Sequence, residues 1–185
     1  MDQAIVVHTP LTNEILEGLE IGQKVLINGV IYTARDAAHK RLVESIAKGE
    51  PLPFDIRNQV IFYAGPTPAK PGAVVGSICP TTSYRMDPHT PALLANGLKA
   101  VIGKGPRGKE VVEALKKHKA VYFAGFAGIG VINSKRIKEA KVVAYDDLGP
   151  EAIRRLAVED FPAIVANDIH GNDIYQREKK RYRIA

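Results

Sequence analysis

The hydrophobic and polar positions near the start of the chain change pattern at a single dipeptide. Residues 24–33 read KVLINGVIYT, so that Asn28-Gly29 separates two runs of β-branched apolar residues. Asn-Gly between such runs is typical of a two-residue turn, because both central positions of that turn need a positive φ. We therefore predict an N-terminal hairpin in which two antiparallel strands open the fold.

The segment after this hairpin has the spacing of an amphipathic helix. Leu42, Val43 and Ile46 recur at intervals of three and four residues, which places them on one helical face. Asp36 is suited to the start of a helix and Gly49 to its end, where a left-handed residue is common. The pattern predicts a helix between these two residues, and Arg35 then lies at a strand-to-helix junction.

The rest of the chain alternates between short apolar runs and segments with helical spacing. Strands are expected over 60–64, 73–78, 100–103, 120–125, 141–145 and 163–166. Helices are expected over 87–96, 111–117 and 150–158, with a turn and an extended edge over 167–176. This alternation is α/β organisation, and it predicts a single domain over residues 1–185 that ends in a basic tail over 176–185.

Composition places the chain among ordinary globular proteins of a reducing compartment. Hydrophobic residues make up 45% and charged residues 25% of the 185 positions, which excludes the disordered class. Cys79 is the single cysteine, so the chain can form neither an internal disulfide nor a self-contained iron-sulfur or thiolate zinc site. No apolar run approaches the roughly 20 residues of a membrane helix, and the first ten residues lack a signal-peptide pattern. We therefore expect a cytoplasmic protein.

The chain is basic, and three of its cations directly follow expected strands. Lys and Arg outnumber Asp and Glu by 26 to 20, a net charge of +6 that favours an anionic partner. Arg35, Arg85 and Lys104 lie in loops at strand ends, where ligands bind in open α/β sheets. Arg grips a carboxylate at two points and Lys supplies a compact charge, so the three suit a small polyanion. Three unrelated surface cations would give the same pattern.

The other candidate polar residues each have a functional and a structural interpretation. Thr81 and Thr82 share the loop of Arg85, so either hydroxyl can bond a ligand held there. A threonine hydroxyl is a poor base without a neighbouring carboxylate, and ordinary turn chemistry explains both residues equally well. His39 and His89 are interpreted as structural histidines, and the Gly-rich run 125–130 lacks the GxGxxG spacing of a nucleotide loop.

Five separated motifs together resemble a known enzyme family. They are YTARDAAHKRL, YAGPTPAKPG, CPTTSYRMD, GKGPRG and the stretch from Val142 to Tyr175. In this order they are similar to the β subunit, or C-terminal domain, of class I fumarate hydratase and of the related L-tartrate dehydratase, from about Leu11 to Tyr175. The resemblance implies a two-part iron-sulfur hydro-lyase: a β part with a swivelling β/β/α fold, and an α part that holds a [4Fe-4S] cluster through three cysteines.

The resemblance also implies roles for residues of this chain. Arg35, Thr81, Arg85 and Lys104 match the family's substrate-binding positions, and Thr81 matches the hydroxyl proposed as the base, acting with an aspartate of the α part. The implied reaction interconverts (S)-malate and fumarate plus water. Two substrate carboxylates need several fixed cations. The Lewis acid has to come from the α partner, because one cysteine cannot hold a cluster, and no metal ligand is expected in this chain.

Two departures from the family pattern leave the substrate open. Cys79 stands where the family commonly has Gly, and Tyr84 where a small residue is common, so the Tyr84 ring can narrow the pocket beside Arg85. L-tartrate dehydratase is therefore the nearest alternative, and association of β chains into a homo-oligomer is left open. A nucleic-acid or polyanion binding module is the alternative of another class, although it would interleave exposed aromatic residues with its cations. No membrane partner is expected.

Overall fold

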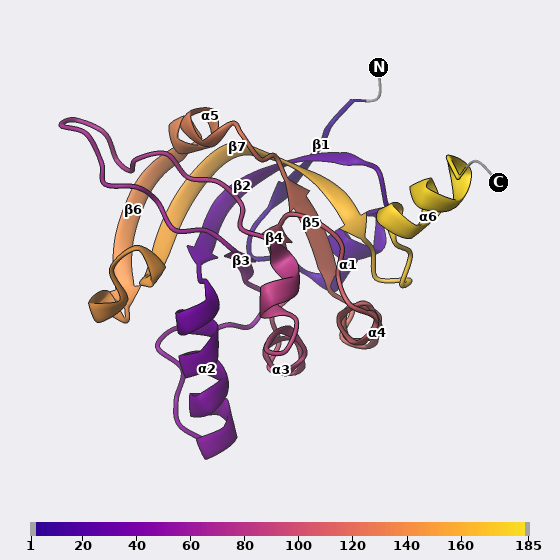
Figure 1. Cartoon of the computed structure of the whole chain (residues 1–185), viewed down its shortest axis with the longest axis horizontal. Helices are drawn as coiled ribbons and strands as arrows, with labels where there is room; N and C mark the ends of the chain where they lie inside the picture. The colour runs from indigo at the N-terminus through magenta and orange to yellow at the C-terminus, as the bar shows by residue number, and fades with distance from the viewer. Residues whose placement is uncertain (1–2, 184–185) are drawn as a thin grey trace.

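The computed structural model describes residues 3–183, so the outermost residues of the expected domain and of its basic tail lie outside it. The described strands form one mixed sheet in the order β1-β2-β3-β4-β5-β7-β6 (Figure 1). They are β1 (Ile5–His8), β2 (Lys24–Thr33), β3 (Val60–Phe62), β4 (Ala100–Gly103), β5 (Val121–Gly125), β6 (Ile137–Ala144) and β7 (Ile153–Asn167). The helices are α1 (Asn13–Glu17), α2 (Asp36–Lys48), α3 (Thr90–Ala95), α4 (Lys109–Lys117), α5 (Gly130–Lys135) and α6 (Ile174–Arg181), with 3-10 turns η1 (Ser83–Met86) and η2 (Asp146–Glu151).

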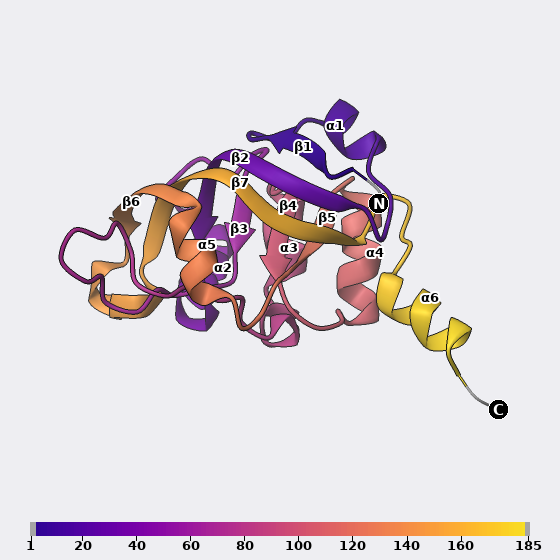
Figure 2. The ribbon, with the colours of Figure 1, turned by 90° about the horizontal axis from the view of Figure 1, so that it is seen from above.

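The direction of the strands explains how the sheet closes. β1 to β5 run parallel to one another, whereas β7 runs antiparallel to β2, β5 and β6. β2 and β7 lie side by side in both views of the ribbon (Figures 1 and 2). Because β7 bonds to both β2 and β5, the sheet curls into a barrel-like arrangement. The expected α/β fold with a mixed sheet in a single domain is confirmed.

The expected N-terminal hairpin is wrong. β2 runs through Asn28 and Gly29 without turning, and a bulge in its pairing with β7 absorbs them. Gly29 does have a positive φ, 108°, and a Cβ there would lie 2.5 Å from Thr9 Oγ1. The Asn28 amide accepts a hydrogen bond from Asp160 N on β7 at 3.0 Å. Asn-Gly suits a β-bulge as well as a turn, and pairing with the distant β7 decides between them.

The helix expected over 150–158 is also wrong, because β7 occupies most of that segment. Leu156 and Val158 are buried at a spacing of two, the period of a strand. Asp160 then has a φ of 48°, and burial resumes at Phe161. Antiparallel partners on both sides of β7 make the segment a strand instead.

Two other segments differ from expectation. Residues 73–78 belong to an extended connection between β3 and η1, which projects at the left of Figure 1. It folds back on itself, because Thr67 N donates to Ser77 O at 3.0 Å. Helix α6 replaces the extended edge expected before residue 176. Its N-cap is Asp173, whose Oδ1 accepts the backbone N–H of Tyr175 at 2.8 Å, and the basic tail begins within this helix.

The remaining elements follow the sequence pattern. α2 begins at Asp36 and is closed by Gly49, which is left-handed with a φ of 69°. Every residue of β3 and β4 is buried, because α2, α3 and α4 cover one face and the barrel interior lies on the other (Figure 1). Phe62 and Phe161 meet in that interior with ring centroids 5.2 Å apart. Within residues 3–183, no helix has the length and apolar character needed to cross a membrane.

Candidate active site

The parallel strands β2, β3 and β4 end at the same edge of the sheet, and the segments around these ends hold the predicted substrate residues. Arg35 follows β2, and Lys104 directly follows β4. Residues 81–83 enter where β3 and β4 separate. Thr81 N donates to Tyr63 O at 2.7 Å, and Lys104 N donates to Thr81 O at 3.2 Å. The fold therefore makes neighbours of Thr81 and Lys104, which are distant in the sequence.

Arg85 is held at the same edge by an ion pair with the start of α2. Its Nη2 donates to Asp36 Oδ2 at 2.6 Å, and the two side chains are 39% and 40% exposed. Partial burial alone would raise the pKa of Asp36, but the hydrogen bond and charge of Arg85 outweigh it, so that pKa lies below its ordinary value. The pair fixes η1, which carries Arg85, against α2, whose N-cap is Arg35.

Arg35 is held from another side by Glu151 of η2. The Arg35 Nη2 lies 3.5 Å from Glu151 Oε1, and Glu151 Oε2 accepts the backbone N–H of Ala37 at 2.9 Å. The Nε of Arg35 is buried and has no hydrogen-bond partner among residues 3–183. A buried donor without a protein partner is rare and is commonly completed by a ligand or an ordered water. Arg35 therefore keeps an unused donor at this edge.

Another arginine, whose side chain is fully buried, holds together the segments that carry these residues. Arg107 follows Lys104 in the same loop, and its Nε donates to Asp87 Oδ1 at 2.7 Å. Its Nη2 donates to Thr90 Oγ1 at 2.8 Å, and its Cζ lies 5.3 Å from the centroid of the Tyr63 ring. Burial lowers the pKa of Arg107, but its interactions with Tyr63 and with the Asp87 carboxylate outweigh burial and raise it. The charged side chain thus ties the Lys104 loop to the end of β3 and to the start of α3.

His39 packs directly behind Arg35. Its Nδ1 lies 2.9 Å from Arg35 O, and its ring meets that of Tyr63 edge-on with centroids 5.0 Å apart. Burial lowers the pKa of His39 to about 4, so the ring is neutral near pH 7 and its Nδ1–H donates to the carbonyl. The Nε2 has no partner in the described part of the chain. These contacts agree with the structural reading of this histidine.

Packing accounts for the Gly-rich run and for the two departures from the family pattern. A Cβ on Gly130 would collide with Ser77 Oγ and lie 2.8 Å from Cys79 Sγ. The glycine therefore lets α5 approach the segment 77–79, where Cys79 is half-buried. Tyr84 is 64% exposed, so its ring faces solvent rather than the core of this chain.

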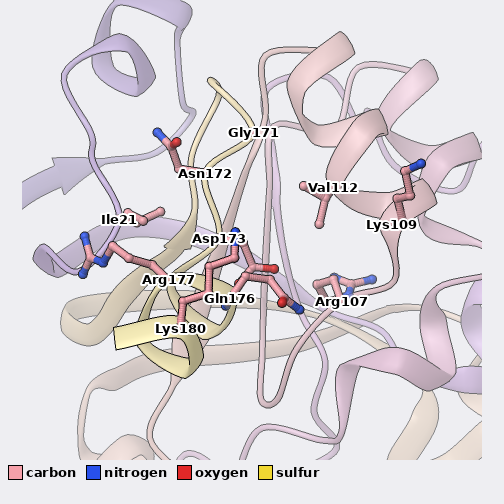
Figure 3. Close-up of a pocket in the computed structure, with 10 residues that line it drawn as sticks. All are labelled: Ile21, Arg107, Lys109, Val112, Gly171, Asn172, Asp173, Gln176, Arg177 and Lys180. Atoms are coloured by element: carbon pink, nitrogen blue, oxygen red, sulfur yellow. The ribbon is translucent and has the colours of Figure 1, made fainter. Parts of the chain in front are cut away.

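A separate cavity of about 680 Å³ lies between α4 and α6, away from the four predicted residues. Figure 3 shows Lys109 and Val112 on one side of it, and Asp173 and Gln176 on the other. The cations that line it are Arg107, Lys109, Arg177 and Lys180. Their charge favours anions, but this cavity does not include the hydroxyl and guanidinium groups gathered at the strand ends.

Sequence reasoning identified the cations at the edge but missed the groups that position them. Asp36 was assigned only to a helix start, and its pairing with Arg85 has no signal in local spacing. Glu151 fell within an expected helix, which hid its position beside Arg35. Arg107 was one more cation in a loop, and only the fold shows that it is buried.

Comparisons with known proteins place the chain in a family. The family model described as "Fumarase C-terminus" matches residues 1–178. "Fumarate hydratase 2" of Leishmania major is 38% identical over 159 residues, which cover 85% of this chain and 28% of that protein. "Fumarate hydratase class I, aerobic" of Escherichia coli (strain K12) is 39% identical over 85% of this chain and 29% of its own length. The chain thus spans less than a third of these two relatives.

A third relative has nearly the same length as this chain. "Putative L(+)-tartrate dehydratase subunit beta" of Methanocaldococcus jannaschii is 38% identical over 177 residues, which cover 92% of this chain and 91% of that protein. The match with the family model and this match both extend over the segments that carry the candidate site. The chain therefore belongs to the fumarase C-terminus family.

Proposed function

We propose that this chain is the β part of a two-chain hydro-lyase that interconverts (S)-malate and fumarate plus water. Its relatives include fumarate hydratases and a tartrate dehydratase β subunit, which supports hydro-lyase chemistry. The observation that carries the proposal is the position of Arg35, Thr81, Arg85 and Lys104 in segments at the ends of three parallel strands. A dicarboxylate needs such an arrangement of fixed cations.

In this proposal the cations bind and orient the substrate. Arg85 and Arg35 each offer a planar fork to a carboxylate, and Lys104 adds a compact charge. Removing the proton next to a carboxylate builds negative charge on its oxygens. Fixed cations stabilise that charge best when they are already in position, and here Asp36 and Glu151 hold the two guanidinium groups before substrate arrives.

Thr81 moves the proton in this proposal. Its backbone is bonded on both sides, to Tyr63 O and to Lys104 N, so its hydroxyl stays at the edge beside the cations. A hydroxyl requires a carboxylate nearby to act as a base. We assign that carboxylate to an aspartate of the α part, which would face Thr81 once the two chains meet.

The proposed cofactor is a [4Fe-4S] cluster held by the α part, where it supplies the Lewis acid for the leaving hydroxyl. The residues of this chain do not fit a cluster. Cys79 is its single cysteine, and residues 3–183 contain no group of three or more His, Cys, Asp or Glu side chains placed to hold a metal. We place the assembled enzyme in the reducing cytoplasm, where thiolate-bound clusters are stable.

Substrate choice tests the proposal directly. The chain is co-expressed with the cluster-bearing α chain of the same organism, and the anaerobic complex is assayed with fumarate, (S)-malate and L-tartrate. We expect reversible hydration of fumarate with a higher kcat/KM than dehydration of L-tartrate. Turnover of L-tartrate alone would assign the chain to tartrate dehydratase, and turnover of neither would overturn the hydro-lyase proposal.

The cavity between α4 and α6 favours a second candidate function, polyanion binding. Four cations line it, and affinity for a polyanion would fall steeply with salt. Titration with a fluorescent single-stranded RNA at two salt concentrations tests this function. Salt-sensitive binding that Lys109→Ala and Lys180→Ala abolish together would support it, and no binding at low salt would rule it out.

A further inference from the structure

Exposed large hydrophobic side chains are gathered near the candidate active site. Among the described residues they are Val6, Val74, Tyr84, Phe126, Val131, Ile132 and Tyr182. All except Val6 and Tyr182 lie in the connections that leave the carboxyl ends of β3 and β5. These are the ends that flank Thr81 and Lys104. The exposed apolar side chains are therefore concentrated in these two connections and are not spread evenly over the molecule.

The most exposed part of this surface is the segment formed by Phe126 and α5. Val131 and Ile132 are 62% and 51% exposed, and Phe126 is 38% exposed. The helix is anchored from behind, because Asn133 Nδ2 donates to Ile78 O at 3.2 Å. Ile78 precedes the active-site loop directly. We call the side chains of Phe126, Val131 and Ile132 the α5 face; it is held in a fixed position relative to the site.

A folded protein gains nothing from adjacent exposed apolar side chains unless something covers them. Scattered single ones are ordinary, but grouped ones commonly mark an interaction site. The segment 77–81 connects the α5 face to the candidate site, because Ile78 N donates to Gly130 O at 3.2 Å and Thr81 N donates to Tyr63 O at 2.7 Å. The Arg85 and Lys104 side chains are exposed to water in the single chain. A partner that covers the apolar rim would also exclude water from the cations, which strengthens their attraction for a carboxylate.

The lengths of the relatives indicate which partner covers the α5 face. This chain spans 28% and 29% of two fumarate hydratases, but 91% of a separate β subunit. In the longer relatives, the remaining sequence is covalently attached to the part that this chain matches. In a two-chain enzyme the same contact has to be made without a covalent link, and exposed apolar side chains provide the attraction.

We propose that the α5 face is the docking surface for the cluster-bearing α chain. Docking there sets the α chain over Arg35, Thr81 and Arg85, so that one contact both joins the chains and closes the site. This inference rests on the proposed function and adds to it the surface through which the partner binds. Polar substitution of the α5 face should break association without touching a residue that binds substrate.

The test compares two charge-introducing variants at equally exposed positions. Val131→Glu with Ile132→Glu alters the α5 face, and Val6→Glu alters β1, where Val6 is 53% exposed. Each tagged chain is co-expressed with the α chain of the same organism, and the dissociation constant is measured by titration. We expect the α5 variant to bind at least about tenfold more weakly than wild type, as for loss of interface anchors, and Val6→Glu to bind normally.

A second measurement does not depend on the variants being folded. Hydrogen–deuterium exchange of the wild-type chain should show slower exchange over residues 126–135 when the α chain is added. The same exchange at 5–8 in β1 should not change. Full binding by a folded α5 variant, or no protection over 126–135 in the complex, would overturn the docking surface and leave the proposed function in place.

Two further outcomes separate the alternatives. If wild type does not bind the α chain at all, the proposed function fails and the docking surface fails with it. If the wild-type chain alone is a dimer that the α5 variant dissolves into monomers, the occupant is a second copy and the proposal is wrong. Arg85→Lys should bind the α chain normally while losing activity, because it alters the substrate site and not the α5 face.

Discussion

Arg85 has more hydrogen-bonding capacity than its ion pair uses. A guanidinium carries five N–H donors, and within residues 3–183 the Arg85 side chain makes a single hydrogen bond, from Nη2 to Asp36 Oδ2. Arg35 keeps an unpartnered Nε in the same region. Each arginine is therefore held in place by an acidic side chain while retaining donors for a ligand. This is the property expected of a binding residue rather than of a surface ion pair.

Arg85→Lys should damage the assembled enzyme although the charge is kept. A lysine cannot grip a carboxylate at two points, so we expect a loss of about 2 kcal/mol in transition-state binding, roughly thirtyfold in kcat/KM. Arg57→Lys is the matched control, because Arg57 also pairs with an aspartate, Asp55, at 2.7 Å, but far from the site on an exposed loop. Equal kinetics of the two variants would make Arg85 an ordinary surface cation.

Substitutions at Thr81 distinguish a chemical role of its hydroxyl from a structural role. Its backbone hydrogen bonds to Tyr63 and Lys104 do not involve the hydroxyl, so Thr81→Val should preserve the fold. If the hydroxyl moves the proton, kcat of the assembled enzyme should fall by about a hundredfold or more, with a smaller effect on KM. Thr81→Ser, which keeps the hydroxyl, should retain most activity. A Val variant that turns over normally would remove Thr81 from the mechanism.

At the scale of elements, local sequence signals predicted where the candidate cations lie better than they predicted how the strands of the sheet pair. Arg35 and Lys104 were identified because each follows a strand, and the helix from Asp36 was predicted from its spacing and its end signals. The prediction of a turn at Asn28 and Gly29 was wrong, because a glycine with a positive φ suits a β-bulge as well as a turn. Only the pairing of β2 with β7 distinguishes the two. The path of β7 was not predicted for the same reason. Its partners lie far away in sequence, so no window of local pattern contains them.

The contact between α2 and the end of β3 makes stability depend on pH. His39 lies in this contact, and burial lowers its pKa from 6.5 to about 4 in the folded chain. Between these values the unfolded chain binds a proton that the folded chain refuses. The free energy of unfolding should therefore hold its full value above pH 6.5 and fall by about 3 kcal/mol as the pH drops toward 4.

Urea unfolding at pH 7 and at pH 4.5 measures this dependence. The variant His39→Gln should lose most of it, because Gln does not titrate. His170→Gln serves as the control, since His170 is exposed. An unchanged pH dependence in His39→Gln would show that another group is responsible.

At the scale of the whole molecule, the proposed substrate-binding residues come together at one edge of the sheet. The parallel strands bring three cations and a hydroxyl to a single edge, and the segment 77–81 connects the α5 face to it. The basic tail and the cavity of Figure 3 lie at α6, apart from this edge. The sequence predicted the need for a partner from its single cysteine. Only the fold shows that the predicted site opens onto a surface where a partner can close it.

The central claim is that the cations at this edge bind the dicarboxylate that the assembled enzyme hydrates. The most direct test is kcat/KM for fumarate hydration by the anaerobic complex, with Arg35→Gln, Arg85→Gln and Lys104→Gln combined in this chain and binding of the α chain verified separately. We predict an intact complex whose kcat/KM is lower by at least about a hundredfold, since each lost charged contact costs more than 1 kcal/mol. An intact complex that hydrates fumarate as fast as wild type would contradict the account.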